Sequence, residues 1–185
     1  MMATTPKRGL TLLELAIVMV VLAVLASLAL PSMAARLRAE RLQSAAEMFA
    51  ADIADARHEA ARRGSALHVV AQTAAGPGPA WCWSVATRAT CSCASAGAAE
   101  ATPAPAAAQA AQTNACTLKT VPAREHPGVT LAQSQPVRLE PDGQAGAVLA
   151  AVFTSGERQL QVQVSRFGRT RVCDPLGNST RLPRC

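Results

Sequence analysis

Apolar residues run almost without interruption through the first part of the chain. Between Leu10 and Leu30, Glu14 is the only charged side chain. A stretch of about 20 apolar residues is what an α-helix needs to cross the hydrocarbon core of a bilayer. We therefore predict a transmembrane half-helix over residues 10–30. A carboxylate in such a segment is unfavourable unless it is paired, so Glu14 indicates an interaction with a partner.

Beyond Pro31, apolar residues recur at steps of three and four, the period of an amphipathic helix that packs on one side. Alanine favours helix, and Gly64 after Arg62 and Arg63 is a typical helix end, with cations at the negative end of the helix dipole. The pattern predicts that residues 31–63 continue the first helix as an amphipathic half. Its expected buried positions are Leu42, Ala45, Ala46, Phe49, Ile53, Ala56 and Ala60.

After Gly64 the hydrophobic period changes to two residues. In the clearest case, Leu160, Val162 and Val164 alternate with glutamines and are expected to face a core. Turns rich in glycine and proline separate the segments. The predicted strands cover residues 66–72, 81–87, 129–132, 137–139, 146–154 and 159–165, and a last strand begins after Gly168. The fold class that follows is α+β, a long N-terminal helix packed on a small antiparallel β-sheet domain at residues 64–185.

Composition limits the size of the expected core. Half of the residues are hydrophobic, but many of these are alanine, and only 3% of all residues are aromatic, with no tyrosine. We expect a small core of leucine, valine and isoleucine. Residues 94–115 form an insert rich in Ala, Pro, Ser, Gln and Thr, without aromatic side chains, which predicts a flexible surface loop.

Positive charge is concentrated at the C-terminus. The net charge is +6, and without Lys7 and Arg8 the 16 remaining basic residues face 12 acidic ones. Residues 166–185 hold five arginines and a single acid, Asp174, so the whole remaining excess of +4 lies there. The guanidinium group is a planar fork of donors that matches phosphate, which indicates an anionic partner. The five are Arg166, Arg169, Arg171, Arg181 and Arg184.

Six cysteines follow the apolar N-terminal segment, which indicates an oxidising compartment in which disulfides persist. Sequence proximity favours a bridge between Cys173 and Cys185, and a bridge from Cys91 or Cys93 to Cys116 would close the insert. A zinc site and a redox-active thiol pair are the alternatives, but Cys91-Ser92-Cys93 lacks the C-x-x-C spacing of either. The candidates for disulfide bonds are Cys82, Cys91, Cys93, Cys116, Cys173 and Cys185.

A processing motif precedes the apolar run. It consists of the basic pair Lys7-Arg8, then Gly9, with Glu14 as the fifth residue after the glycine. This arrangement resembles the processing site of type IV pilins, pseudopilins and their minor relatives. The resemblance implies that residues 1–9 are a leader, that a prepilin peptidase cuts between Gly9 and Leu10, and that the new N-terminus at Leu10 is methylated. It also implies that Glu14 pairs with the N-terminus of a neighbouring pilin during assembly, although phenylalanine is usual in the family where this chain has Leu10.

The same resemblance implies a precursor that crosses the bacterial inner membrane once, with a periplasmic C-terminal domain, and that later enters a pilus or pseudopilus at the cell surface. An ordinary secretory signal, cleaved near Ser32-Met33-Ala34, and a plain membrane anchor are the alternatives. The apolar run is longer than the core of a secretory signal and contains Glu14, which neither alternative explains.

The strongest candidate for chemistry is the segment Phe167-Gly168-Arg169-Thr170-Arg171. Residues two apart in a strand project from the same face, so its two arginines are expected about 7 Å apart, near the spacing of successive phosphates on a nucleic acid strand. A bridge between Cys173 and Cys185 would fold Arg181 and Arg184 back beside them. The simpler interpretation is a solvated charged face that keeps the protein soluble.

The turn Pro127-Gly128-Val129, the late alternating strand and the terminal Gly-Arg-x-Arg element together resemble the FimT/GspH group of minor pilins. In the FimT branch this element is the DNA-binding motif used in natural transformation. The resemblance implies non-specific binding to the phosphate backbone of duplex DNA. The alternative is a structural minor pseudopilin of a type II secretion system, or a structural minor pilin that primes pilus assembly. The residues that the first hypothesis assigns to DNA are Gly168, Arg169, Arg171, Arg166, Arg181 and Arg184.

An enzymatic function finds little support in the sequence. His58, His68 and His126 are scattered, and neither an H-E-x-x-H motif nor a phosphate-cradling glycine loop occurs. We expect no catalytic residue, no metal and no cofactor. The predicted partners are prepilin peptidase, other pilins through the N-terminal helix, the inner membrane before assembly, and duplex DNA.

Overall fold

The computed structural model describes residues 12–73, 81–91, 93, 116–146, 149–179 and 181–185, except for the side chains of residues 28–32. The chain divides into two compact units, residues 1–37 and residues 38–185. The predicted cleavage site at Gly9 and Leu10 and the predicted insert at residues 94–115 lie outside the described residues.

Helix α1 (Leu12–Arg63) is continuous through Pro31. In the first unit its described apolar side chains are exposed, as at Leu12, which is 87% exposed. Glu14 lies in the first turn of the helix. The predicted transmembrane segment at residues 10–30 falls only partly within the described residues. Within the part of the chain that the structure describes, no helix combines the length and the hydropathy needed to cross a membrane.

In the second unit, the C-terminal half of α1 forms one side of the hydrophobic core. All of the positions that the three- and four-residue spacing selects are buried, and Leu42, Phe49 and Ile53 are among the most deeply buried side chains. The helix ends at Arg63, and Gly64 follows it with a φ of +65°, the left-handed conformation that commonly ends a helix. The predicted buried face and helix end are confirmed.

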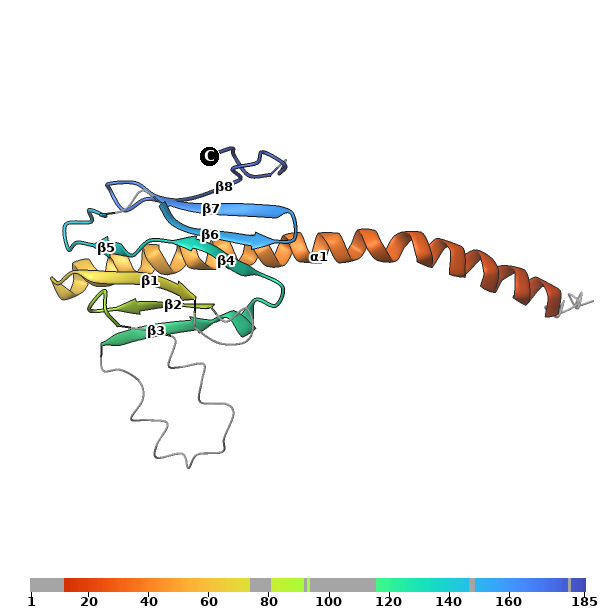
Figure 1. The fold of residues 1–185 in the computed structure, drawn as a ribbon, viewed down its shortest axis with the longest axis horizontal. Helices are drawn as coiled ribbons and strands as arrows, with labels where there is room; N and C mark the ends of the chain where they lie inside the picture. The colour runs from red at the N-terminus through yellow and green to blue at the C-terminus, as the bar shows by residue number, and fades with distance from the viewer. Residues whose placement is uncertain (1–11, 74–80, 92, 94–115, 147–148, 180) are drawn as a thin grey trace, which may run out of the picture. The chain divides into compact units, whose positions relative to one another are not determined.

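Two four-stranded antiparallel sheets complete the domain and share their core with α1 (Figure 1). Their orders are β3-β2-β1-β5 and β4-β6-β7-β8, and a short 3₁₀ turn, η3 (Ala123–Glu125), follows β3. This is the α+β pilin-like fold expected from the sequence. The strands of the first sheet are β1 (Leu67–Thr73), β2 (Trp81–Ala86), β3 (Thr117–Pro122) and β5 (Val137–Leu139). The strands of the second sheet are β4 (Thr130–Ser134), β6 (Leu149–Ser155), β7 (Arg158–Val164) and β8 (Thr170–Cys173).

The strand predictions need three corrections. Strand β3 was missed because Leu118 and Lys119 are both exposed, so its sequence shows no alternation of apolar and polar residues. The strand predicted at residues 146–154 does not include Gly146; residues 147–148 lie outside the described part of the chain, and β6 covers Leu149–Ser155. The strand predicted at residues 129–132 begins one residue later and extends to Ser134.

Aromatic rings connect the helix to both sheets. The ring of Phe49 in α1 lies 5.4 Å from Trp83 in β2 and 5.5 Å from Phe153 in β6, both edge to face. Trp83 also stacks with His126 at 5.5 Å and donates its indole N–H to the buried Asp52 of α1 at 2.7 Å. Such pairs add to the stabilisation from buried area alone. The core is therefore more aromatic than the predicted core of leucine, valine and isoleucine.

Three disulfides pair all of the cysteines, so within the described residues no free thiolate remains for zinc or for redox chemistry. Cys91–Cys116 spans the region that contains the predicted insert. Cys173–Cys185 closes the C-terminal segment. The remaining bridge, Cys82–Cys93, joins β2 to the residues that follow it.

Candidate nucleic-acid interface

Strands β7 and β8 are joined by a tight turn whose loop is Arg166-Phe167-Gly168. Gly168 N donates to Ser165 O at 2.9 Å, and Ser165 N donates to Arg169 O at 2.9 Å. Arg169 N also donates to Ser165 Oγ at 3.1 Å. A three-residue hairpin loop of this kind ends in a left-handed residue, and Gly168 meets that requirement with a φ of +68°.

Glycine is required at position 168 by space as well as by conformation. A Cβ atom there would lie 2.6 Å from Arg57 Cδ and 2.8 Å from Gly143 O. Both approaches are closer than real Cβ atoms make, so any other residue would displace the helix, the loop or the turn. The glycine of the Gly-Arg-x-Arg element thus has a structural reason in this fold.

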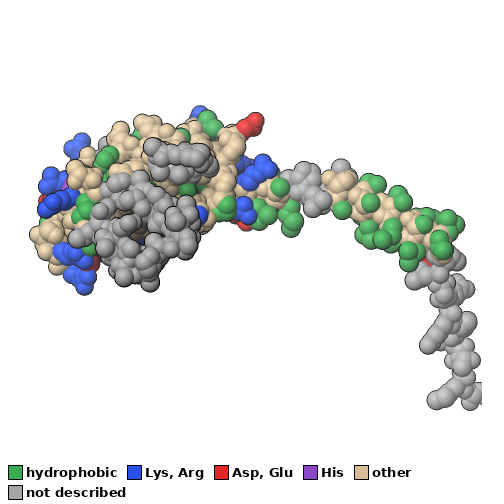
Figure 2. Space-filling view, turned by 60° about the horizontal axis from the view of Figure 1, so that its bottom comes forward, with side chains coloured by type: hydrophobic (Ala, Val, Ile, Leu, Met, Phe, Trp, Pro, Cys, Tyr) green, Lys and Arg blue, Asp and Glu red, His purple; other side chains and the backbone are tan. Residues whose placement is uncertain are grey.

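Two further carbonyl groups of the turn accept hydrogen bonds from neighbouring elements. Arg166 O accepts a hydrogen bond from Ala145 N at 2.9 Å, and Phe167 O accepts one from Arg57 Nη1 at 3.1 Å. With the backbone fixed from behind, the side chains of Arg166, Phe167 and Arg169 are exposed. Figure 1 shows the turn at the end of the domain where α1 ends, and Figure 2 shows Lys and Arg side chains gathered at that end.

The two arginines of the element lie along the edge of the second sheet. Strand β8 is the last strand in the order of that sheet. Thr170 and Val172 are half-buried, whereas Arg169 and Arg171 alternate with them and are exposed. Arg171 is paired with Gln163 of β7. Arg171 in β8 and Arg169 directly before β8 are therefore both exposed to solvent, beside a strand that pairs with β7 on its inner side.

The C-terminal segment returns to the same edge. Cys173, at the end of β8, is bonded to Cys185, with 5.0 Å between their Cα atoms. Asp174 N donates to Pro183 O at 2.9 Å, and Cys185 N donates to Asp174 O at 3.4 Å. The last residues of the chain thus lie beside the end of β8.

This return places Arg184 near Arg171. Arg171 Nη2 donates to Arg184 O at 3.5 Å. The Arg184 guanidinium lies against the turn at Gly177, where an added Cβ would be 3.5 Å from Arg184 Nε. Arg181 lies in the same disulfide-closed segment, and its backbone N–H donates to Ser179 Oγ at 3.3 Å. Arg166 and Arg169 are in the turn at the other end of β8.

Asp174, the only acid of this segment, does not neutralise the arginines. It is buried, and its carboxylate accepts hydrogen bonds from the backbone N–H groups of Leu176 at 2.9 Å, Gly177 at 3.1 Å and Ser179 at 2.7 Å. A carboxylate bound by several N–H groups is satisfied without a cation. Among the described residues, none of the five C-terminal arginines forms an ion pair with an acid.

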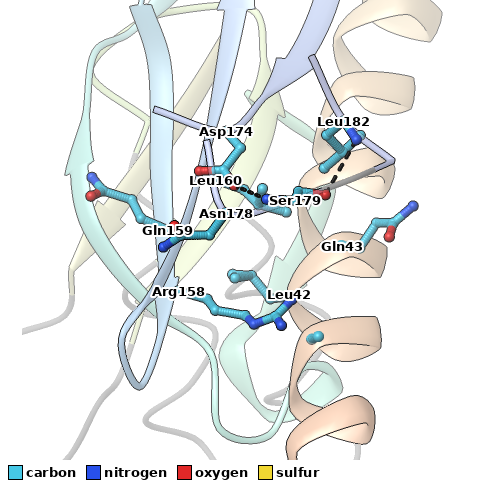
Figure 3. Close-up of a pocket in the computed structure, with 10 residues that line it drawn as sticks. Leu42, Gln43, Arg158, Gln159, Leu160, Asp174, Asn178, Ser179 and Leu182 are labelled. Carbon is cyan, nitrogen blue, oxygen red and sulfur yellow. Dashed lines mark hydrogen bonds between the residues drawn. The ribbon is translucent and has the colours of Figure 1, made fainter. Parts of the chain in front are cut away.

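The C-terminal segment also has an inner side, shown in Figure 3. Ser179 Oγ accepts the N–H of Leu182 at 3.2 Å, and Leu182 packs against the core beside Leu42 of α1 and Leu160 of β7. A hollow of about 40 Å³ remains between these elements. Ligand pockets hold roughly 300 Å³ or more, so this hollow is a packing gap and not a ligand site.

Sequence reasoning missed one residue of this region, Arg57, and the exposure of another, Phe167. Arg57 is 110 positions away from Phe167 in the chain, and no sequence pattern predicts their contact. Phe167 was included in the candidate segment, but no role was predicted for its side chain. The structure shows that Phe167 is 75% exposed.

Comparisons with known families match two parts of the chain. Residues 5–30 match the prokaryotic N-terminal methylation motif, and residues 45–168 match the type II transport protein GspH. The second match ends at Gly168, before Arg169 and Arg171. Searches of curated proteins and of solved structures gave no match.

Proposed function

The chain belongs to the GspH family of type II transport proteins, and we propose that within this family it is a minor pilin that binds DNA non-specifically for uptake in natural transformation. The family consists of type IV minor pilins and pseudopilins, which are structural subunits and not enzymes. The methylation motif implies processing by a prepilin peptidase, membrane anchoring and assembly with other pilins. DNA binding is the further step that we propose.

The observation that carries the proposal is the state of the C-terminal arginines. Arg169 and Arg171 lie on the solvent side of one edge strand, and Arg184 is brought beside Arg171 by the terminal disulfide. Asp174 is satisfied by backbone N–H groups, so it leaves this positive surface intact. Preorganised guanidinium forks without acidic partners suit phosphate oxygens.

A surface of this kind recognises the charge of the DNA backbone and not the base sequence. Each phosphate neutralised on duplex DNA releases counterions, so affinity falls with a salt slope of about 0.9 per contact. Binding of this type has dissociation constants of roughly 10⁻⁴ to 10⁻⁶ M at physiological salt. Several copies in one filament would raise the effective affinity, so that a retracting filament would hold DNA more tightly than a single subunit does.

One observation favours the alternative, a structural minor pseudopilin of type II secretion or a structural minor pilin that primes assembly. The family match covers the scaffold up to Gly168 and does not include the two arginines that follow. Membership of the family therefore does not depend on these two arginines. In that case the arginines would be a solvated charged face.

The test compares DNA affinities of the full chain in neutral detergent with those of matched double variants. Arg169→Ala/Arg171→Ala is expected to lose most of its binding to duplex DNA. Arg88→Ala/Arg158→Ala removes two other exposed arginines, and hence the same charge, and should keep it. Arg169→Lys/Arg171→Lys keeps the charge without the planar fork and should lie between the two. Equal binding by the wild type and both alanine variants would leave the structural role as the better account.

A further inference from the structure

Phe167 is the most exposed of the large apolar side chains described in residues 38–185, at 75%. Its backbone is nevertheless fixed, because Phe167 O is bound by Arg57 Nη1 at 3.1 Å. An aromatic ring on a rigid turn loses little conformational freedom when it binds a partner. In the chain, Phe167 is next to Arg166, two positions from Arg169 and four from Arg171, the two arginines of the proposed phosphate site.

We propose that Phe167 is a nucleobase-stacking residue, which makes the turn a site for single-stranded or frayed DNA as well as for the phosphates of duplex DNA. The inference rests on the DNA binding proposed above and adds the kind of DNA that the turn prefers. Proteins that bind single strands combine guanidinium or ammonium groups along the backbone with aromatic side chains that stack on bases. In a closed duplex the base faces are covered, so stacking there requires unstacking first.

A hollow beside Phe167 has room for the stacked base. It measures about 320 Å³ and is lined by Phe167, by Arg57 and His58 of α1, and by Asp142 and Gln144. This size is at the lower end of the range of small-ligand sites, about 300–1,000 Å³. Phe167 is one of the residues that line it, and the side chains of Arg57, His58 and Gln144 are polar groups that suit the edge of a base.

The charge inside the hollow distinguishes a base from a phosphate. The Asp142 carboxylate accepts hydrogen bonds from Gln144 N at 3.0 Å and Gln144 Nε2 at 2.9 Å, and it forms part of the wall of the hollow. Because the Arg57 guanidinium lines the same hollow and offsets this carboxylate, a phosphate gains no net attraction there, and an uncharged base gives up none. The phosphates are therefore left to the arginines of the strand, and the base is assigned to the hollow.

The remaining aromatic side chains do not compete for this role. Phe49, Trp81, Trp83 and Phe153 are all buried in the core. A single ring supplies one stacking contact, for which alanine substitution weakens binding by about tenfold. The expected effect is thus limited to one residue and one base.

The experiment measures binding of the full chain, in neutral detergent, to three labelled probes of one length. These are a single-stranded oligonucleotide, an abasic strand with the same phosphates, and the duplex of the same sequence. The wild type is expected to bind the normal strand about tenfold more tightly than the abasic strand. Phe167→Ala should bind the two strands equally, with its duplex affinity and salt slope unchanged. Phe167→Trp should restore the preference.

Leu118→Ala is the matched control, because Leu118 is an exposed apolar residue of β3 in the other sheet. It should behave as the wild type with all three probes. If wild type and Phe167→Ala bind all probes alike, stacking is overturned while phosphate binding stands. If Phe167→Ala weakens strand and duplex equally, the ring supports the turn and the inference is wrong. If the wild type binds none of the probes, both the inference and the proposed function fail.

Discussion

Two groups of arginines in the domain differ in how their charge is used. At the end of α1, Arg62 and Arg63 both bind Glu59, with 2.7 Å between Arg62 Nη2 and Glu59 Oε2. At the C-terminal edge, the nearby acid, Asp174, is buried and bound by backbone N–H groups instead. Both groups lie on the surface, yet only the first has an acidic partner among the described residues. The two groups therefore differ in the position of the nearest acid and not in the number of arginines. Because their acid is buried, the C-terminal arginines form the surface that suits phosphate.

The largest effect is expected where the arginine edge is held in place. Gly168→Ala combines an unfavourable positive φ with a close approach to Arg57 and Gly143, so we expect a loss of about 3 kcal/mol in unfolding free energy, together with weaker DNA binding. Gly156→Ala is the control, because Gly156 has a φ of +59° but open space around an added Cβ. Chemical denaturation measures both variants. Equal losses would show that the packing behind the turn has no role.

Replacing the buried Asp174 tests whether DNA binding depends on the net charge of the edge or on the fixed positions of its arginines. Asp174→Ala increases the positive charge of the edge but leaves three backbone N–H groups without their acceptor, with an expected loss of about 2 kcal/mol. We expect faster hydrogen exchange over residues 175–182 and weaker DNA binding, because Arg184 loses its fixed place. Tighter binding by the variant would mean that net charge alone governs the surface. Glu157→Ala, which removes an exposed acid from the turn between β6 and β7, controls for the change in charge.

Acid pH is expected to weaken the scaffold and leave both groups of arginines charged. Burial, the main cause, lowers the pKa of His126 below its ordinary value of 6.5. The unfolded chain then binds the proton more readily, so stability is full above about pH 6.5 and falls as the pH drops below it. The melting temperature should fall by a few degrees between about pH 7.5 and about pH 5. His126→Phe, which keeps an aromatic ring beside Trp83, should remove part of this dependence, and His68→Gln should remove another part, because burial also lowers the pKa of His68.

The smallest effect is expected at the helix end. Arg62 and Arg63 hold the pKa of the Glu59 carboxyl at about 2, so this pairing persists at any pH used for binding and is lost only as the pH falls towards that value. Glu59→Gln frees two arginines and should raise duplex DNA affinity slightly. Glu47→Gln is the control, since Glu47 is bound by the uncharged Gln43. An equal gain in both variants would indicate a general effect of net charge.

Sequence periodicity predicted the scaffold better than the site. The buried face of α1, including Phe49 and Ile53, follows from three- and four-residue spacing because one helix packs on one core. Strand β3 could not be predicted, because its exposed Leu118 breaks the alternation on which the method depends. The arginine element was readable as a motif. Its anchoring by Arg57 was not, because that contact joins residues far apart in the chain.

The measurement that tests the account most directly is the salt dependence of duplex DNA binding by the full chain and two double variants. Arg169→Ala/Arg171→Ala and Arg62→Ala/Arg63→Ala each remove two positive charges from the same domain. The account predicts that the first variant lowers the slope of log affinity against log salt by about 1.8, which corresponds to two phosphate contacts, and that the second leaves it unchanged. Equal slopes in both variants would contradict the claim that the C-terminal arginines, and not arginines in general, bind DNA.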